Sequence, residues 1–545
     1  MPDTVSRRSA PRLPRGSGVM RRLAVVLTAL AATLLAAAPT STAASPASAA
    51  QDPPLVRTEQ GWVRGETTAE GRQFLGIPYA QPPVGDLRWR APRPVEKWHG
   101  VRAARDFGNR CVQTKSWDPG YEEPSHTEDC LDLNVYVPEG AGRRPVMVWL
   151  HGGGLTAGAG EDIVPDTFAR QTGTVVVTVN YRLGAMGFLA AAGLDREARD
   201  GVSGNFGMLD QRAALRWVRA NVGRFGGDPG RVTIAGESAG GRSVCTQMAS
   251  PMSQGLYRAG IVQSGAYEDC AARTHKEAVT QGAAFMEKLG CTSVACLRGK
   301  SAKEVLAAQA GFPWEPVVGG DFLPVQPFEA YANGAAARVP VLDGANQDEG
   351  RMFAFAQFDA NGKPLTAERY PDVVRSAFGA ERADRVLQRY PLSDYASPTL
   401  AYATAFGDQL MACPALRLDD VLEDRGPVYA YEFADRTSPP FASLRNLGTD
   451  FDFGATHVNE VQYLFKHFGL ESPLNAEQRV LSRQMIQYWG SFIRDGVPRA
   501  DGQPAMPDGQ EKVLSLRTPS QGGNSQSATV SREHQCDLWD APSTR

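Results

Sequence analysis

The sequence predicts an α/β fold, in which helices cover both faces of a doubly wound, mostly parallel sheet. Short apolar, β-branched runs recur without polar alternation, which is typical of strands buried on both faces. Segments of helical periodicity lie between these runs, and such alternation favours a parallel sheet. The motifs that could carry chemistry follow the ends of the runs, where the sites of such sheets are found.

The clearest strand-like runs and helical segments can be placed by residue number. Strands are expected at 145–150, 174–181, 231–236, 259–265, 339–344 and 427–433, and helices at 208–225 and 475–494. No Pro/Ser-rich linker interrupts the chain after about residue 55. We therefore expect residues 51–545 to form a single domain.

The N-terminal segment has the order of a secretory signal peptide. Arg21-Arg22 precede an apolar run at 23–38, and small residues follow up to Ala50. The run is shorter than the roughly 20 residues that span a bilayer. We expect residues 1–50 to be removed by cleavage near Ala49 or Ala50, the mature chain to have no stable membrane span, and the protein to be secreted.

Charge and motifs exclude several classes of function. The net charge is -3, from 57 basic and 60 acidic residues, so there is no electrostatic reason to expect a nucleic-acid partner. The chain has no Gly-rich dinucleotide fingerprint, no Walker loop and no Cys/His cluster with zinc spacing. We therefore expect no cofactor and no metal ion.

The central motif is Gly236-Glu237-Ser238-Ala239-Gly240, a G-x-S-x-G sequence. It directly follows an expected strand and precedes a helix-compatible segment that runs to about Ala249. This context is the nucleophile elbow of the α/β-hydrolase fold, with Ser238 as nucleophile and the N–H of Ala239 directed at the oxyanion. A plain glycine turn is the alternative, which the strand–turn–helix context disfavours.

A second glycine motif, His151-Gly152-Gly153-Gly154, ends the strand expected at 145–150. Glycines let backbone N–H groups approach a bound ester closely. Gly153 and Gly154 would complete an oxyanion hole with Ala239. An ordinary glycine loop is the alternative, and the elbow that follows later in the chain disfavours it.

The general base is expected among the histidines that follow the elbow, because hydrolases of this fold order their residues as Ser, acid, His. His275 is too close to the elbow, and His534 lies in a polar tail. His457 lies in a loop after the last expected strand, which is the right topological place. The acid is Asp348 or Glu349, and position alone does not choose between them.

Together these residues resemble the type-B carboxylesterase family, which includes cholinesterases and secreted microbial esterases and lipases. The resemblance covers about residue 55 to Trp539 and rests on the segments 128–134, 151–154, 204–211, 236–240, 263–265, 348–350 and the His457 loop. It implies an α/β-hydrolase fold and hydrolysis of small carboxylic esters to acid and alcohol through a covalent acyl-enzyme.

The resemblance also assigns roles that position leaves open. It matches the family's acid to Glu349, its base to His457, and its oxyanion donors to the three N–H groups named above. Glu237 and Ser264 match positions in a buried polar network behind the site, and a structural role for them is the alternative. Phe353 matches a position that often lines the pocket, with core packing as the alternative.

Eight cysteines suit an exported protein. The resemblance implies three disulfides: Cys111–Cys130, Cys291–Cys296 and Cys413–Cys536. Cys245 and Cys270 remain. They follow the elbow and the next strand, which are neighbours in this fold, so a fourth bridge and two free thiols are both open.

Two other functions compete with ester hydrolysis of small substrates. A catalytically inactive adhesion protein of the same fold would lack members of the triad, and all three match here. A lipase would need a large apolar lid, but the 111–130 loop is polar and acidic. Few aromatic candidates for a choline site are evident, because Trp117 lies in a shortened loop and Met352 stands where an aromatic would help. We therefore expect uncharged esters with short to medium acyl chains.

Overall fold

A central sheet of eleven strands organises the chain in the computed structural model, which describes residues 53–116, 118, 120–445, 447–509 and 512–540. Its strands are, in spatial order, β18 (Ser525–Ser527), β17 (Val513–Leu516), β15 (Val428–Phe433), β14 (Val341–Asn346), β11 (Ala259–Gln263), β10 (Gly227–Glu237), β7 (Arg144–Leu150), β9 (Val175–Val179), β6 (Asp132–Val137), β4 (Gly71–Pro78) and β3 (Glu66–Thr68). The expected signal peptide lies outside the described residues.

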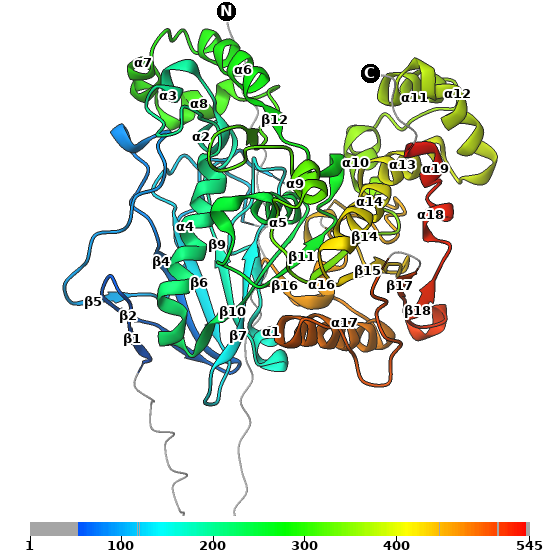
Figure 1. Cartoon of the computed structure of the whole chain (residues 1–545). Coiled ribbons are helices and arrows are strands. Elements are labelled where there is room, and N and C mark those ends of the chain that lie inside the picture. The colour runs from blue at the N-terminus through cyan, green and yellow to red at the C-terminus, as the bar shows by residue number, and fades with distance from the viewer. Residues whose placement is uncertain (1–52, 117, 119, 446, 510–511, 541–545) are drawn as a thin grey trace, which may run out of the picture. The chain divides into compact units, whose positions relative to one another are not determined.

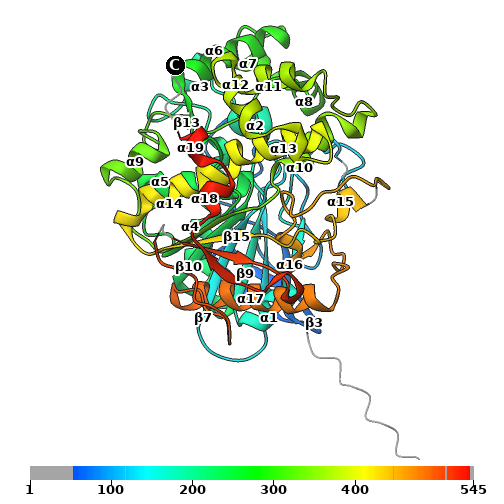
Figure 2. The same cartoon turned by 90° about the vertical axis from the view of Figure 1, so that its right-hand side faces the viewer.

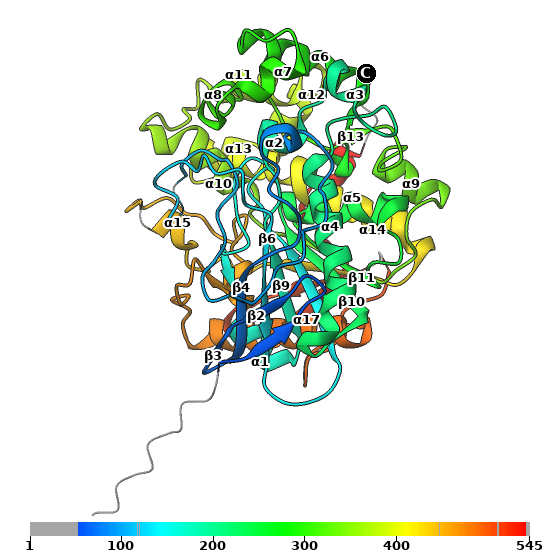
Figure 3. The same cartoon turned by 90° about the vertical axis from the view of Figure 1, so that its left-hand side faces the viewer.

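The middle of the sheet is parallel and its edges are antiparallel. The seven strands from β9 to β17 run in one direction, with Ile234 of β10 paired to Val148 of β7 and to Gly260 of β11. β6, β4 and β3 extend one edge antiparallel, and β18 closes the other. Figure 3 shows β6, β4 and β3 on the same side as β9. The carboxyl ends of the parallel strands therefore meet along one edge of the sheet.

Both faces of the sheet are covered, which explains why the strands carry unalternating apolar runs. Val148 of β7 packs into the cluster that includes α4 (Phe206–Asn221) and α5 (Ala239–Ala249). Its neighbour Trp149 packs into the opposite cluster, with α1 (Asp166–Thr172) and α17 (Ala476–Asp495). Figure 1 shows α17 and α4 on different sides of the strands. The α/β prediction is confirmed.

The expected elements are present with small differences at their ends. The helix expected at 208–225 is α4 followed by a 3₁₀ turn at Val222–Phe225, and the one expected at 475–494 is α17. Asn475 caps α17 through its side chain and forms a capping box with Gln478. Within the described ranges, no helix has the length and apolar character needed to cross a membrane.

The remaining elements surround this core. The other helices are α2 (Gly184–Phe188), α3 (Ala192–Asp195), α6 (His275–Lys288), α7 (Val294–Gly299), α8 (Ala302–Ala308), α9 (Pro327–Asn333), α10 (Gly350–Gln357), α11 (Tyr370–Phe378), α12 (Ala380–Arg389), α13 (Pro398–Gly407), α14 (Cys413–Leu422), α15 (Ala442–Arg445), α16 (Val461–Leu464), α18 (Val530–Glu533) and α19 (Cys536–Trp539), with a π-helical turn at Asp408–Ala412. Small sheets join β1 (Leu55–Arg57), β2 (Trp62–Arg64) and β5 (Val101–Ala103), β8 (Ile163–Val164) and β16 (Lys466–His467), and β12 (Arg273–Thr274) and β13 (Val317–Val318).

Four disulfides staple the fold. They join Cys111 to Cys130, Cys245 to Cys270, Cys291 to Cys296 and Cys413 to Cys536, so no free cysteine remains in the described part of the chain. The pair that the sequence left open, Cys245 and Cys270, ties α5 to the segment after β11. Cys245 belongs to the helix that begins directly after Ser238.

Candidate active site

The chain turns sharply between β10 and α5, and Ser238 occupies the turn with φ 55° and ψ -124°. A positive φ costs a serine about 1–3 kcal/mol and persists where the surroundings impose it. Here close packing imposes it. A Cβ added to Gly240 would lie 1.9 Å from the carbonyl oxygen of Leu150, and one on Gly236 would lie 2.4 Å from the Gly240 backbone. Only glycine fits at positions 236 and 240, each two residues from Ser238.

Ser238 lines a cavity of about 1090 Å³, together with His457, Glu237 and the glycines 152–154. This volume is slightly larger than the roughly 300–1,000 Å³ that is usual for small-molecule sites. Aromatic side chains from distant segments form much of the wall: Trp149, Tyr267, Phe312, Trp314, Phe353, Phe441 and Phe468. The premise that aromatic candidates are few is therefore wrong. Met352 and Phe353 both line the cavity, whereas Trp117 lies outside the described residues.

Glu349 contacts the imidazole of His457 directly. Its Oε2 lies 2.6 Å from His457 Nδ1, and both side chains are buried. Its Oε1 accepts two further hydrogen bonds, from the hydroxyl of Ser264 at 2.5 Å and from the backbone N–H of Asn346 at 2.7 Å. The carboxylate is thus held by three partners, which fixes its orientation toward the imidazole.

Asp348, the alternative acid, turns to the other side of the loop. It forms ion pairs with Arg351 at 2.9 Å and with Arg436 at 2.9 Å, and its Oδ2 accepts the N–H of Ala455 at 3.0 Å. It therefore anchors the loop that leads to His457. The structure brings Glu349, and not Asp348, to the imidazole.

Glu237 lies on the other side of the imidazole, with Oε1 3.3 Å from His457 Nε2. Burial raises the pKa of Glu237 to about 8, although His457 opposes the shift. Burial lowers the pKa of His457, but the charges of Glu237 and Glu349 outweigh it and raise that pKa to about 9. The pKa of Glu237 and the pKa of His457 each depend on the charge of the other group, so these two side chains titrate together. The direction that follows from the geometry is a His457 pKa above the ordinary 6.5.

The glycine loop lies against the elbow. A Cβ on Gly152 would lie 3.2 Å from Cβ of Ser238. Gly153 and Gly154 have φ of 99° and 62°, and in the described structure neither N–H donates to another protein group. Ala239 is the first residue of α5, so its N–H has no intrahelical acceptor. These N–H groups are therefore available to an oxygen atom held above Ser238.

The structure also reveals a buried polar network that the sequence analysis missed. Glu460 accepts hydrogen bonds from Asn346 Nδ2 at 2.6 Å and Gln263 Nε2 at 3.0 Å. Gln263 Oε1 in turn accepts the indole N–H of Trp489 at 2.9 Å. No cluster that could hold a metal ion, around Glu460 or elsewhere, occurs within the described ranges. The place of Glu460 three residues after the histidine was the available signal.

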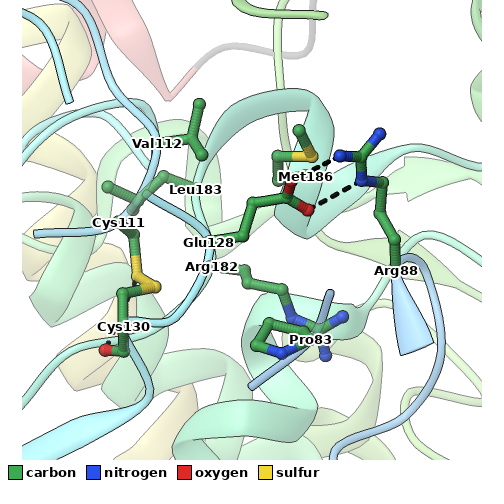
Figure 4. Close-up of a pocket in the computed structure, with 9 residues that line it drawn as sticks. All are labelled: Pro83, Arg88, Cys111, Val112, Glu128, Cys130, Arg182, Leu183 and Met186. Atoms are coloured by element: carbon green, nitrogen blue, oxygen red, sulfur yellow. Dashed lines mark hydrogen bonds and ion pairs between the residues drawn. A yellow bond between two sulfur atoms is a disulfide. The ribbon is translucent and has the colours of Figure 1, made fainter. Parts of the chain in front are cut away.

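A second, much smaller cavity of about 10 Å³ lies near the Cys111–Cys130 bridge (Figure 4). Arg88 lines it and donates to Glu128 Oε2 through Nε at 2.7 Å, while its Nη1 donates to the carbonyl of Lys300 at 2.5 Å. This volume cannot hold an ester. The arginine instead clamps the disulfide loop to the end of α7.

The sheet and the serine turn define the class of α/β-hydrolases, in which a nucleophile at the end of a central strand faces a histidine and an acid. Comparison with known proteins is more specific. A family model described as "Carboxylesterase family" matches residues 52–539. The chain therefore belongs to the carboxylesterase family.

Relatives from several organisms support this assignment. An acylcarnitine hydrolase of Mus musculus is 35% identical over 85% of this chain and 87% of its own length. A para-nitrobenzyl esterase of Bacillus subtilis (strain 168) is 33% identical over 82% of this chain and 91% of its own length. A solved structure titled as a thermophilic PNB esterase superposes with a TM-score of 0.75 at 30% identity, covering 89% of this chain and 99% of that one. The protein is accordingly a carboxylic-ester hydrolase.

Proposed function

We propose that this carboxylesterase acts through a Ser238–His457–Glu349 triad and a covalent acyl-enzyme. His457 takes the proton of Ser238 as the hydroxyl oxygen attacks the ester carbonyl, and Glu349 stabilises the imidazolium that forms. The N–H groups of Gly153, Gly154 and Ala239 bind the oxyanion. His457 then protonates the leaving alcohol, and water activated by the same histidine releases the acid.

One observation carries the proposal. Ser238 and His457 line the same cavity, and a carboxylate with three fixed contacts lies 2.6 Å from Nδ1 on the far side of the imidazole. Nε2 lies 3.3 Å from Glu237 Oε1, and catalytic hydrogen bonds often tighten only when substrate is bound. Glu237 and Ser264 act as supporting groups, because each contacts one member of the His457–Glu349 pair.

The cavity favours small uncharged esters. Its wall is largely aromatic and aliphatic, which suits an acyl chain of short to medium length. Cleavage of choline esters is a separate question, because the same aromatic faces could hold a quaternary ammonium. We retain uncharged esters as the proposed substrates, since Met352 lies in the wall where a further aromatic face would help.

We also propose that the chain is exported, with residues 1–50 as a cleaved signal peptide and residues 51–545 as one catalytic domain. The described residues from 53 to 540 form one compact unit. The four disulfides fit an oxidising compartment.

Replacing the nucleophile tests the mechanism. Ser238→Ala should fold normally and lose hydrolysis of p-nitrophenyl butyrate. The wild type should be labelled at Ser238 by an organophosphonate, as read by peptide mass spectrometry. Hydrolysis that survives the substitution, or label on another residue, would refute the mechanism.

A further inference from the structure

A buried histidine near the C-terminus, His534, makes no contact with His457 or Glu349 and has carboxylate partners of its own. His534, expected in a polar tail, is instead 5% exposed. Its Nδ1 lies 2.5 Å from Asp408 Oδ1 and its Nε2 lies 2.9 Å from Glu432 Oε1. A neutral imidazole has one N–H, so only the imidazolium donates to both carboxylates.

The two carboxylates belong to different elements and are themselves held. Asp408 begins the π-helical turn Asp408–Ala412 and accepts the hydroxyl of Tyr390 at 2.8 Å. Glu432 lies in β15 and accepts the hydroxyl of Ser515 at 3.1 Å. Figures 1 and 2 show the C-terminal helices α18 and α19 beside α13 and α14, which flank this turn. His534 therefore joins the end of the chain to the turn on one side and to the sheet on the other.

Charge in this cluster is best assigned to His534. Burial lowers its pKa, but Asp408 and Glu432 raise that pKa well above the ordinary value. Burial raises the pKa of Asp408, although His534 and Tyr390 oppose the shift. The contact with Glu432 favours a charged His534. Glu432 binds the opposite nitrogen, and although burial raises the pKa of Glu432, the hydrogen bond and charge of His534 lower it.

The turn that His534 holds reaches the active site in two ways. Leu410 and Met411 line the same cavity as Ser238. Gly407, the residue before the turn, packs so closely on the triad acid that a Cβ there would lie 3.3 Å from Cβ of Glu349 and 2.6 Å from the N–H nitrogen of Gly350. π-helical turns interrupt regular helices and recur at functional sites.

We propose that His534 is a positioning residue, which acts through Asp408 to hold the π-helical turn that forms the Leu410–Met411 wall of the catalytic cavity. The inference rests on the proposed function, since this wall contacts substrate only if Ser238 is the nucleophile. The contact to Asp408 sets the wall, and the contact to Glu432 ties the C-terminal segment to the sheet. The two contacts should therefore differ in their effect on substrate selection.

A matched pair of substitutions separates positioning from stability. Asp408→Asn and Glu432→Gln each remove one buried carboxylate from His534 and keep the shape of the side chain. The readout is the ratio of kcat/KM for p-nitrophenyl butyrate to that for p-nitrophenyl acetate. This ratio is independent of the folded fraction, because both substrates report on the same active molecules. His99→Gln, at an exposed histidine, controls for the substitution in His534→Gln.

We expect Asp408→Asn and His534→Gln to change the ratio by about fivefold or more, and Glu432→Gln and His99→Gln to change it by less than about twofold. Equal shifts for Asp408→Asn and Glu432→Gln, or no shift for either, would overturn the positioning role. If His534→Gln does not fold, the matched pair still decides. Failure of the proposed function would appear differently, as hydrolysis that survives Ser238→Ala.

Discussion

Replacement of the triad acid by its amide gives a sharp test, because the structure predicts how the new side chain must lie. In Glu349→Gln, one end of the amide must occupy the site of Oε1, where the backbone N–H of Asn346 donates at 2.7 Å. A backbone N–H cannot accept a hydrogen bond, so the amide oxygen takes this position. The NH₂ group then faces His457 Nδ1, in place of the oxygen that lies 2.6 Å away.

The consequence is the wrong tautomer of the base. Nδ1 must accept from the amide, so the proton of neutral His457 moves to Nε2, which then cannot accept the proton of Ser238. Loss of the correct tautomer in a serine–histidine–acid triad costs on the order of 10⁴-fold in kcat, or about 5 kcal/mol. Asp348→Asn leaves the tautomer intact. We expect it to lower kcat by less than about tenfold, through a looser 452–455 loop, and to lower the melting temperature.

The assay is the initial rate with p-nitrophenyl butyrate, expressed per mole of folded protein for each variant. Circular dichroism checks that both variants are folded. If Asp348→Asn lost more activity per mole than Glu349→Gln, the assignment of the acid would be wrong. If Glu349→Gln kept more than about a tenth of the wild-type kcat, the tautomer argument itself would fail.

Three further predictions follow from the same structure. The charges of Glu237 and Glu349 raise the pKa of His457 above 6.5. Because only the neutral imidazole acts as base, kcat/KM should fall as the pH drops through that raised pKa. A rate that stayed flat down to about pH 5 would contradict a histidine base. Protein recovered from the culture medium should begin near residue 50. It should show no titratable thiol when denatured without reductant, since all eight cysteines are paired. Two reactive thiols would show that Cys245 and Cys270 are not bonded in solution. An uncharged butyrate ester should have a higher kcat/KM than butyrylcholine. A tenfold higher kcat/KM for the choline ester, about 1.4 kcal/mol, would instead show that the aromatic wall binds cations.

The strands of the sheet and the elbow at Ser238 could be predicted from patterns of residues close together in the sequence. The apolar runs became β7, β10 and their neighbours within a few residues, because strands buried on both faces have a distinctive composition. The elbow was equally local, since the glycines around Ser238 are required by contacts within a few residues and with the adjacent strand. The Ser, acid, His order then followed from topology.

Position in the sequence could not choose between Asp348 and Glu349. The family resemblance matched the acid to Glu349, and the tertiary structure gave the physical reason. Asp348 and Glu349 are neighbours of similar chemistry, and their directions depend on what packs around them: two arginines on one side and Ser264 and His457 on the other. No periodicity carries this information. Glu460 was missed for the same reason, because its partners Asn346 and Gln263 come from other strands.

By itself, then, the sequence determined the α/β sheet, the elbow at Ser238 and the family that these motifs resemble, because each depends on residues close together in the chain. The tertiary structure alone decided that Cys245 bonds Cys270 and that aromatic side chains from distant segments enclose the cavity. It also placed Glu349, which the resemblance had matched to the family's acid, against His457. It also buried His534, although the surrounding sequence is polar. Long-range packing decides which of several chemically competent groups meet, and a buried charge is retained only where opposite charges from other elements surround it.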